Sequence, residues 1–519
     1  MVCYHTTRKE YNTHLYTFCP IETFRLNFDI FPPSTCEDSM QAQNGKDACL
    51  ESYVIVFKLS SEHVNKSEKN QETQNNTLHS KKPIWPIVLN LSIVLLMCGL
   101  LYYAVSYQLF KPRTDAGKYE CYALVFWQGK NAVHVLPPEQ CLFLSNYSPS
   151  SIIEGMKAWR VPAPIIHLAE SQNTAEPFRN LPFEYPLLSI IPFSLGLIAP
   201  ITWYQVAFAL WMLLLAALIY FILYKTRSTG AAIAFAFYLV VGNWGSAAAR
   251  FDLVPAALIL GSVILGARMR WRWAFALLAL ATMFKFFPVL LVVPFLIAQQ
   301  KQYSEKWLSW SRWSALALYC GICLLTTVAS LSLNIANTIS PFLYFTNRPI
   351  QVESAAATLL WLGKYLGYPF SIIQTYGSVN IVSALSHKVS LLSTLGLIAG
   401  LIYTFWLQWR DKLDIYTASL LTVLIIIITG KVFSPQYLIW VAPLLAFVGQ
   451  ANWRWLLTWG VIGLLTTWVY PTMYNSTLLK DVPLLPTFYP VVFARDLLIF
   501  GFVLALLYQA SRKSFLVNT

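Results

Sequence analysis

The chain has 519 residues, of which 56% are hydrophobic and only 12% are charged. Soluble domains carry about 25% charged residues, so this composition excludes an ordinary soluble protein, and its repeated apolar runs of about 20 residues indicate many membrane spans. The net charge of +13 does not indicate a nucleic-acid partner, because the excess of Lys and Arg falls in short loops between apolar runs, where basic residues orient spans.

Residues 1–83 are polar and carry 9 Lys and Arg against 10 Asp and Glu. They lack the early apolar core of a signal peptide, and their low hydrophobicity predicts a loosely ordered cytoplasmic tail. Lys81 and Lys82 end this tail and should hold the start of the first span in the cytoplasm. The membrane domain is then predicted to cover residues 84–511, with a short cytoplasmic tail at 512–519.

Clusters of Lys and Arg in six short connections predict the orientation of the spans. If all six clusters face the cytoplasm, about twelve apolar runs alternate consistently and both termini lie inside. The expected spans are residues 84–106, 203–223, 231–248, 253–267, 273–284, 286–298, 313–333, 391–407, 415–429, 437–448, 455–470 and 491–508. The short run 187–200 is bounded by prolines and is expected to enter the membrane and return without crossing.

The first outward loop, residues 107–186, is the longest of the predicted extracytoplasmic segments. It contains Cys121 and Cys141. The two thiols could form a disulfide if the loop faces an oxidising compartment, and two free thiols are an equal alternative. The sequence alone leaves this choice open.

Charged side chains close to a bilayer are costly and often mark a functional site. Those that the orientation rule does not explain all fall on the predicted outer side: Asp115, Glu184, Arg250, Asp252, Lys285, Arg348, Glu353 and Lys431. Several fixed cations suit a phosphate, and one of the carboxylates could accept a proton. The pattern predicts group transfer from a phosphorylated lipid whose head group lies at the outer surface and whose tail lies among the spans.

Each of these residues also has a plainer interpretation. Asp115 could be a solvated helix cap, and Lys285 could extend to the membrane interface as lysines near span ends often do. Arg250 and Asp252 could simply pair with each other, and Glu184 could cap the helix that Pro186 begins.

Six short motifs follow one another at the expected ends of spans. They are Asp115 with Tyr119, Phe183-Glu184-Tyr185-Pro186, Arg250-Phe251-Asp252-Leu253-Val254-Pro255, Lys285-Phe286-Phe287-Pro288, Arg348-Pro349-Ile350-Gln351-Val352-Glu353-Ser354 and Phe433-Ser434-Pro435-Gln436-Tyr437. In this order they resemble glycosyltransferase family 87, whose best known members are polyprenol-phosphate-mannose-dependent alpha-1,2-mannosyltransferases. The resemblance implies an all-α membrane protein with the C-type glycosyltransferase fold, about twelve transmembrane helices and a long first extracytoplasmic loop.

The resemblance also implies roles for individual residues. Asp115 would be the general base that takes the proton of the acceptor hydroxyl. The leaving lipid phosphate would be held by four cations: Arg250, Lys285, Arg348 and Lys431. The substrates would be bound by Tyr119, Glu184, Tyr185, Asp252, Gln351, Glu353 and Gln436.

The expected function is therefore an inverting glycosyltransferase that moves a hexose, mannose by resemblance, from a polyprenyl phosphate to a hydroxyl of a lipid-linked or surface glycan. The expected partners are the bilayer, the polyprenyl-phosphate sugar and the glycan acceptor, with no cofactor and no nucleic acid. A lipid or glycan transporter is one alternative, although the sequence shows one broken helix pair and no second copy of it. The other is a metal-dependent phospholipid transferase, in which a divalent ion would be gathered by four carboxylates: Asp115, Glu184, Asp252 and Glu353.

Overall fold

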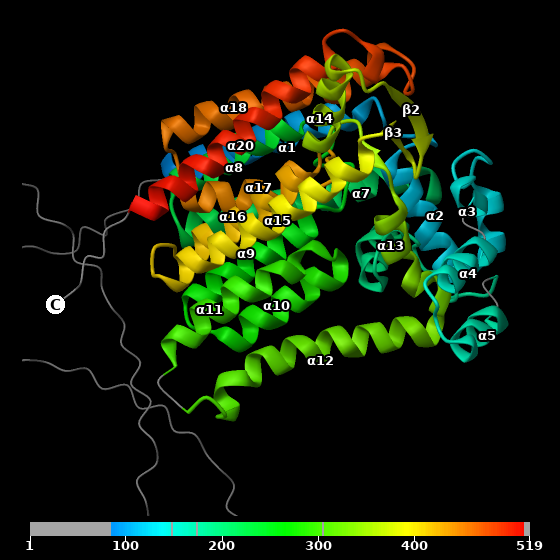
Figure 1. Cartoon of the computed structure of the whole chain (residues 1–519), viewed down its shortest axis with the longest axis horizontal. Helices are drawn as coiled ribbons and strands as arrows, with labels where there is room; N and C mark the ends of the chain where they lie inside the picture. Colours follow the sequence, from blue (N-terminus) through cyan, green and yellow to red (C-terminus); the bar gives the residue numbers. More distant parts are fainter. Residues whose placement is uncertain (1–84, 147–148, 173–174, 304–305, 513–519) are drawn as a thin grey trace, which may run out of the picture. The chain divides into compact units, whose positions relative to one another are not determined.

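The computed structural model describes residues 85–146, 149–172, 175–303 and 306–512. The predicted tail at 1–83 and residues 513–519 of the predicted C-terminal tail lie outside the described residues. The described chain is almost entirely helical, which confirms the predicted all-α membrane fold class (Figure 1). A small three-stranded sheet, which the sequence did not predict, accompanies the helices.

Twelve apolar helical segments of two lengths carry the hydrophobic sequence of the described part. Six are long enough to cross a membrane: Trp85–Ser106 (α1), Ile201–Thr226 (containing α7, Tyr204–Thr226), Trp310–Leu333 (α12), Ser386–Trp409 (α15), Trp453–Ser476 (containing α18, Trp453–Thr467) and Phe488–Arg512 (α20). Six are shorter: Leu187–Ile198, Thr229–Asn243 (α8), Leu253–Ala267 (α9), Trp271–Phe284 (α10), Ile415–Thr429 (α16) and Tyr437–Gly449 (α17). The chain is thus a multi-pass membrane protein, and the number of crossings stays a prediction.

The expected span at 286–298 is interrupted. Lys285 ends α10 in an extended conformation, a 3-10 turn covers Phe287–Leu291, and α11 then runs from Val292 to Gln302. Pro288 lies within this turn, where it removes a backbone donor and prevents a continuous helix. The break leaves Lys285 at the end of a helix rather than in the middle of one.

The central helices pack through small residues. An added Cβ at Gly463 of α18 would lie 3.0 Å from the Cα of Gly242 in α8. Only glycine allows two helix backbones to approach this closely, which is how membrane helices gain contact without a hydrophobic driving force. The largest hydrophobic cluster includes buried side chains of α7, α8, α9, α16 and α17.

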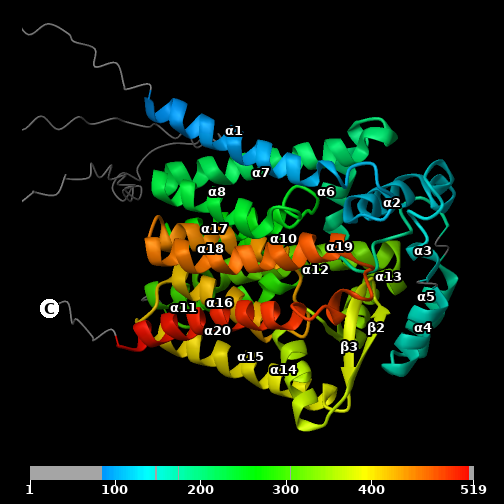
Figure 2. The ribbon, with the colours of Figure 1, turned by 90° about the horizontal axis from the view of Figure 1, so that it is seen from above.

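Short helices and the sheet gather at one end of the helical bundle in both views (Figures 1 and 2). The long first loop contributes Asp115–Gln128 (α2), Phe143–Asn146 (α3), Pro149–Ala158 (α4) and Ala163–Ser171 (α5). The second long loop contributes Ile335–Asn347 (α13), Ile350–Gln351 (β1), Ala355–Gly363 (α14), Phe370–Thr375 (β2) and Ser378–Ser383 (β3). The strand order is β1-β3-β2 and both pairings are antiparallel.

The long first loop is cross-linked. Cys121 of α2 forms a disulfide with Cys141, just before α3. Of the two alternatives that the sequence left open, a disulfide or two free thiols, the structure shows the disulfide. Since α2 carries both Cys121 and Asp115, the cross-link also restrains the helix that begins at the predicted catalytic residue.

Candidate active site

A cavity of about 670 Å³ lies at the loop-rich end of the bundle. Eight of the twelve predicted site residues line it: Asp115, Glu184, Tyr185, Arg250, Arg348, Gln351, Glu353 and Gln436. They come from segments up to about 320 residues apart in the sequence. The sequence predicted only that these side chains lie on the same side of the membrane, whereas the fold places them in one cavity.

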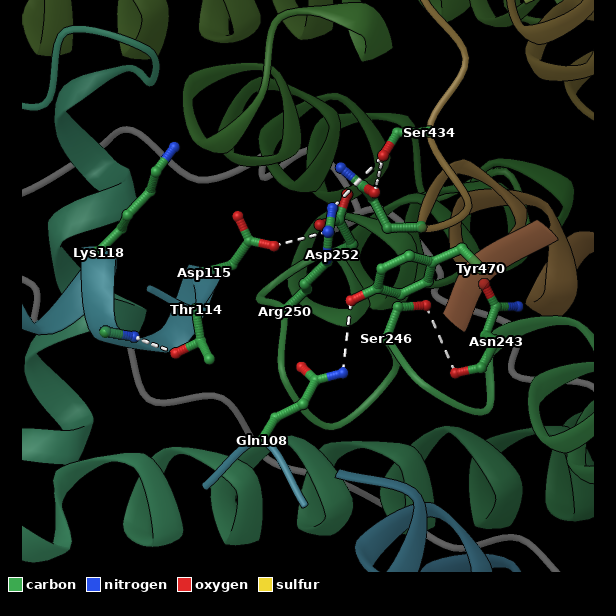
Figure 3. Close-up of polar contacts among 12 residues, drawn as sticks. Gln108, Thr114, Asp115, Lys118, Asn243, Ser246, Arg250, Asp252, Ser434 and Tyr470 are labelled. Carbon is green, nitrogen blue, oxygen red and sulfur yellow. Dashed lines mark hydrogen bonds and ion pairs between the residues drawn. The ribbon is translucent and has the colours of Figure 1, made fainter. Parts of the chain in front are cut away.

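Asp115 and Arg250 form the central ion pair of this cavity. Asp115 is the first residue of α2, and Thr114 caps the helix by accepting a hydrogen bond from the backbone N–H of Gly117. Arg250 Nη2 lies 2.6 Å from Asp115 Oδ2, as Figure 3 shows. The Asp115 side chain keeps 30% of its surface exposed, so its carboxylate is reachable from the cavity.

Arg250 is also held by the opposite wall. Its Nη1 donates to the hydroxyl of Ser434 at 3.4 Å, and its guanidinium lies 5.9 Å from the ring centre of Tyr470. Burial disfavours the charged guanidinium, but the attractions of Asp115, the strongest, and of other neighbouring groups together outweigh burial and raise the pKa of Arg250 above its ordinary value. Arg250 is therefore a permanent cation that links α2 to the segment before α17 (Figure 3).

Lys118 is a cavity residue that the sequence analysis missed. Its Nζ lies 3.4 Å from Glu184 Oε1. The charge of Glu184 raises the pKa of Lys118, while burial opposes this shift. Lys118 lies three residues after Asp115 on α2, and residues at this spacing share a helix face, so the spacing was a signal that could have identified it.

Lys285 and Asp252 lie behind the cavity wall. Lys285 Nζ is 2.6 Å from Asp252 Oδ1, and the indole N–H of Trp440 donates to the same carboxylate oxygen. The ammonium also lies 4.8 Å from the Trp440 ring and 5.3 Å from the Phe251 ring. Asp252 is only 1% exposed, so this pair supports the wall and neither residue lines the cavity.

Replacing Asp252 by Asn should destabilise the protein, because it leaves the Lys285 ammonium without a counter-charge among aromatic rings. Breaking a buried pair on one side costs about 3–5 kcal/mol. Thermal unfolding in detergent would measure the loss. The double variant Asp252→Asn with Lys285→Met should recover most of the stability; equal losses in both variants would show that the charge pair is not the cause.

Tyr119 and Lys431 also lie outside the cavity lining. Tyr119 is 2% exposed and stacks on Phe193 with ring centres 4.3 Å apart, so it belongs to the packed wall. Lys431 donates from its Nζ to the backbone carbonyl of Thr346 at 2.8 Å. Burial and the nearby charge of Arg348 lower the pKa of Lys431. The structure thus does not bring these two predicted site residues to the cavity.

Arg348 is one of three cations of the cavity wall that form no ion pair among the described residues, the others being Lys111 and Arg113. No carboxylate in the described part of the chain lies within ion-pair distance of it. Its Nη2 donates to Gln351 Oε1 at 3.4 Å, and its buried Nε has no hydrogen-bond partner. A guanidinium with free donors in a cavity suits a phosphate, which it can bind through two parallel hydrogen bonds.

Each of the four carboxylates that the metal-dependent alternative would use is paired with a different cation. Asp115 pairs with Arg250, Glu184 with Lys118 and Asp252 with Lys285. Glu353 lies 3.8 Å from Arg495 of α20. Among the described residues, no group of three or more His, Cys, Asp or Glu side chains is placed to hold a metal ion.

Comparisons with known proteins agree with the sequence motifs. The model of glycosyltransferase family 87 matches residues 183–435, a range that contains four of the six motifs and the first three residues of a fifth. The crystal structure of ArnT from Cupriavidus metallidurans in the apo state aligns at 14% identity over 82% of this chain and 77% of that chain, with a TM-score of 0.37. No curated protein matches the sequence significantly. The predicted resemblance to glycosyltransferase family 87 is confirmed over residues 183–435, slightly less than half of the chain, and this match supports a membrane glycosyltransferase.

Proposed function

We propose that the chain is an inverting hexosyltransferase that takes its sugar, mannose in the first instance, from a polyprenyl phosphate. The acceptor would be a hydroxyl group of a lipid-linked or surface glycan. No cofactor is required in this proposal, because the lipid phosphate already activates the sugar as a leaving group.

The observation that carries the proposal is the pairing of two functions in one cavity. Asp115 offers a reachable carboxylate, and Arg348 offers a cation without a counter-charge. Transfer from a lipid phosphate needs both, since a proton must leave the acceptor while negative charge develops on the departing phosphate.

In the proposed step one C–O bond forms and another breaks. The acceptor oxygen attacks the anomeric carbon as its proton passes to Asp115, and a new C–O bond forms. The bond between the anomeric carbon and the phosphate oxygen breaks, and its electron pair stays on the phosphate, which Arg348 stabilises. Arg250 positions the Asp115 side chain through their ion pair, while Gln351 and Glu353 offer hydrogen bonds to sugar hydroxyls.

The cavity is proposed to face away from the cytoplasm. The disulfide between Cys121 and Cys141 supports this orientation, because disulfides persist in oxidising compartments. The basic residues Arg268, Arg410 and Arg454 support it as well, since they follow or begin spans in loops that the positive-inside rule places in the cytoplasm.

Cysteine labelling should verify this orientation. A membrane-impermeant maleimide should label His134→Cys, at an exposed site in the first loop, in intact cells and above the level of the parent chain. The matched variant Met269→Cys, at a site that is 65% exposed between α9 and α10, should react only after permeabilisation. The opposite labelling pattern would contradict the proposed sidedness.

The proposed reaction can be tested with the purified full-length chain in lipid nanodiscs. Radiolabelled polyprenyl-phosphate mannose and other polyprenyl-phosphate hexoses would serve as donors, with membranes of source cells that lack the protein as the acceptor. Label should move to a glycan product, and mass spectrometry should find one added hexose. Movement of labelled lipid across sealed vesicles without a glycan product would favour the transporter, and loss of transfer in chelator would favour the metal-dependent enzyme.

A further inference from the structure

Arg495 is a buried charge within one of the membrane-crossing helices. It lies in α20, its exposed fraction is 0%, and it falls outside the residues that the family model matches. Charged side chains inside spans are costly and are usually retained for a function. The contacts of Arg495 indicate which function this is.

The guanidinium of Arg495 joins two segments that line the active-site cavity. Its Nη2 donates to the backbone carbonyl of Glu353, and its Nη1 lies 3.8 Å from the carboxylate of Glu353. On its other face, the guanidinium carbon lies 3.8 Å from the ring centre of Phe433. Glu353 lines the cavity, and Phe433 immediately precedes the lining residue Ser434.

A second carboxylate fixes the orientation of Arg495. Its Nε and Nη2 donate to Asp496 Oδ1 at 3.0 and 2.9 Å. The other oxygen of Asp496 accepts a hydrogen bond from Thr358 at 3.4 Å. Because these contacts hold the planar guanidinium, its remaining nitrogen Nη1 stays directed at Glu353.

Glu353 extends this cluster to the cavity. It is 2% exposed, and its Oε1 accepts a hydrogen bond from the hydroxyl of Tyr474 at 2.8 Å. Its Oε2 is the oxygen that lies 3.8 Å from Arg495 Nη1, and neither of these two buried atoms has a hydrogen-bond partner. A buried carboxylate with an unused oxygen in a cavity wall has the capacity to accept a further hydrogen bond.

We propose that Arg495 is a positioning residue of the transferase: it keeps Glu353 ionised and oriented so that this carboxylate accepts hydrogen bonds from hydroxyl groups of the bound sugar. The inference rests on the proposed function and adds a residue that acts through Glu353 without touching the substrate. It also explains why a full charge is retained in the last membrane helix.

The charges around Glu353 support this role. Burial raises the pKa of Glu353, and the neighbouring charge of Asp496 raises it further, whereas Arg495, the Tyr474 hydroxyl and Arg250 lower it. Of the three lowering groups, Arg495 has the largest effect. Without Arg495, the pKa of Glu353 should rise further, which favours the protonated carboxyl, and a protonated carboxyl loses part of its capacity to accept hydrogen bonds.

Infrared spectroscopy of the full-length chain in nanodiscs can test the charge of Glu353 directly. Arg495→Met should show a new protonated-carboxyl band that disappears as the pH rises. Because Arg495 also donates to Asp496, the band is assigned in an Asp496→Asn background: Arg495→Met with Asp496→Asn should keep the band, and adding Glu353→Gln should remove it. Absence of the band in Arg495→Met with Asp496→Asn, or its persistence after Glu353→Gln is added, would overturn the proposal.

The pH profile of sugar transfer from polyprenyl-phosphate mannose provides the second measurement. Removing Arg495 raises the pKa of Glu353, so the acidic limb of the profile should move upward by about one pH unit or more, and activity should recover at high pH. Arg495→Lys, which keeps a charge but not the planar fork, should give a smaller shift. The control Arg512→Met, at the exposed end of the same helix, should give none.

The two measurements separate the possible failures. A wild-type chain that transfers no sugar from any polyprenyl-phosphate hexose would overturn the proposed function, while the infrared result would still report on Glu353. An active wild type combined with a pH-independent loss in Arg495→Met would show a merely structural role and would overturn the inference about Arg495.

Discussion

Replacing Asp115 by Asn should reduce the rate of sugar transfer by about 10²–10⁴, the contribution typical of a general base. Asparagine has nearly the same shape and can still accept a hydrogen bond from Arg250, which lies 2.6 Å from the native carboxylate. It cannot take a proton from the acceptor hydroxyl. The loss should therefore appear in kcat, with little change in the KM for the donor.

A surface carboxylate provides the matched control for this substitution. Glu170 lies 3.3 Å from Lys157 in an exposed ion pair of the same first loop, and exposed pairs contribute about 0–1 kcal/mol to stability. Glu170→Gln should thus leave transfer kinetics unchanged. If Asp115→Asn kept more than about a tenth of the wild-type kcat, another group would have to be the base.

Replacing Arg348 by Gln should weaken donor binding more than replacing Lys431. Charge-assisted hydrogen bonds contribute about 1.5–3 kcal/mol, which corresponds to about a 10- to 100-fold increase in the KM for the polyprenyl-phosphate sugar. Arg348 lines the cavity without a carboxylate partner, whereas the ammonium of Lys431 already donates to the carbonyl of Thr346. Steady-state kinetics with varied donor would compare Arg348→Gln and Lys431→Met.

Two further results would sharpen the assignment of Arg348. Inhibition by free polyprenyl phosphate, the leaving product, should weaken in Arg348→Gln by a factor similar to the change in donor KM. Arg454→Gln, at the start of α18, should affect neither constant. An unchanged donor KM together with a raised acceptor KM would instead assign Arg348 to the acceptor side.

The sequence predicted the helical membrane fold and eight of the residues that line the cavity, because charged residues that interrupt or flank apolar runs often mark a site. Asp115, Arg250 and Arg348 were found this way, and all three line one cavity. Their partners could not be predicted. Whether Arg250 pairs with Asp115 or with the adjacent Asp252 depends on side-chain directions that only the folded chain fixes.

Other features of the structure could not be predicted from the sequence, for physical reasons. Tyr119 is an aromatic residue one helical turn from Asp115. The sequence cannot distinguish an aromatic residue that packs in the protein interior from one that contacts the substrate. Arg495 lies inside a predicted span and carried the charge signal, but its partner Glu353 is 142 residues away. The hairpin of β2 and β3 was not predicted, because its six-residue strands are too short to give the long apolar signal by which spans are recognised.

The turn of this hairpin defines the rim of the cavity through its backbone. Tyr376 and Gly377 have φ values of 54° and 62°, the left-handed pair that a tight two-residue hairpin requires, and the carbonyl of Tyr376 accepts a hydrogen bond from the Tyr344 hydroxyl at 2.6 Å. An added Cβ at Gly377 would lie 3.3 Å from Lys118 Nζ. The bare backbone at Gly377 thus leaves room for the Lys118 ammonium beside Glu184, and any larger residue in the turn would press on that ion pair.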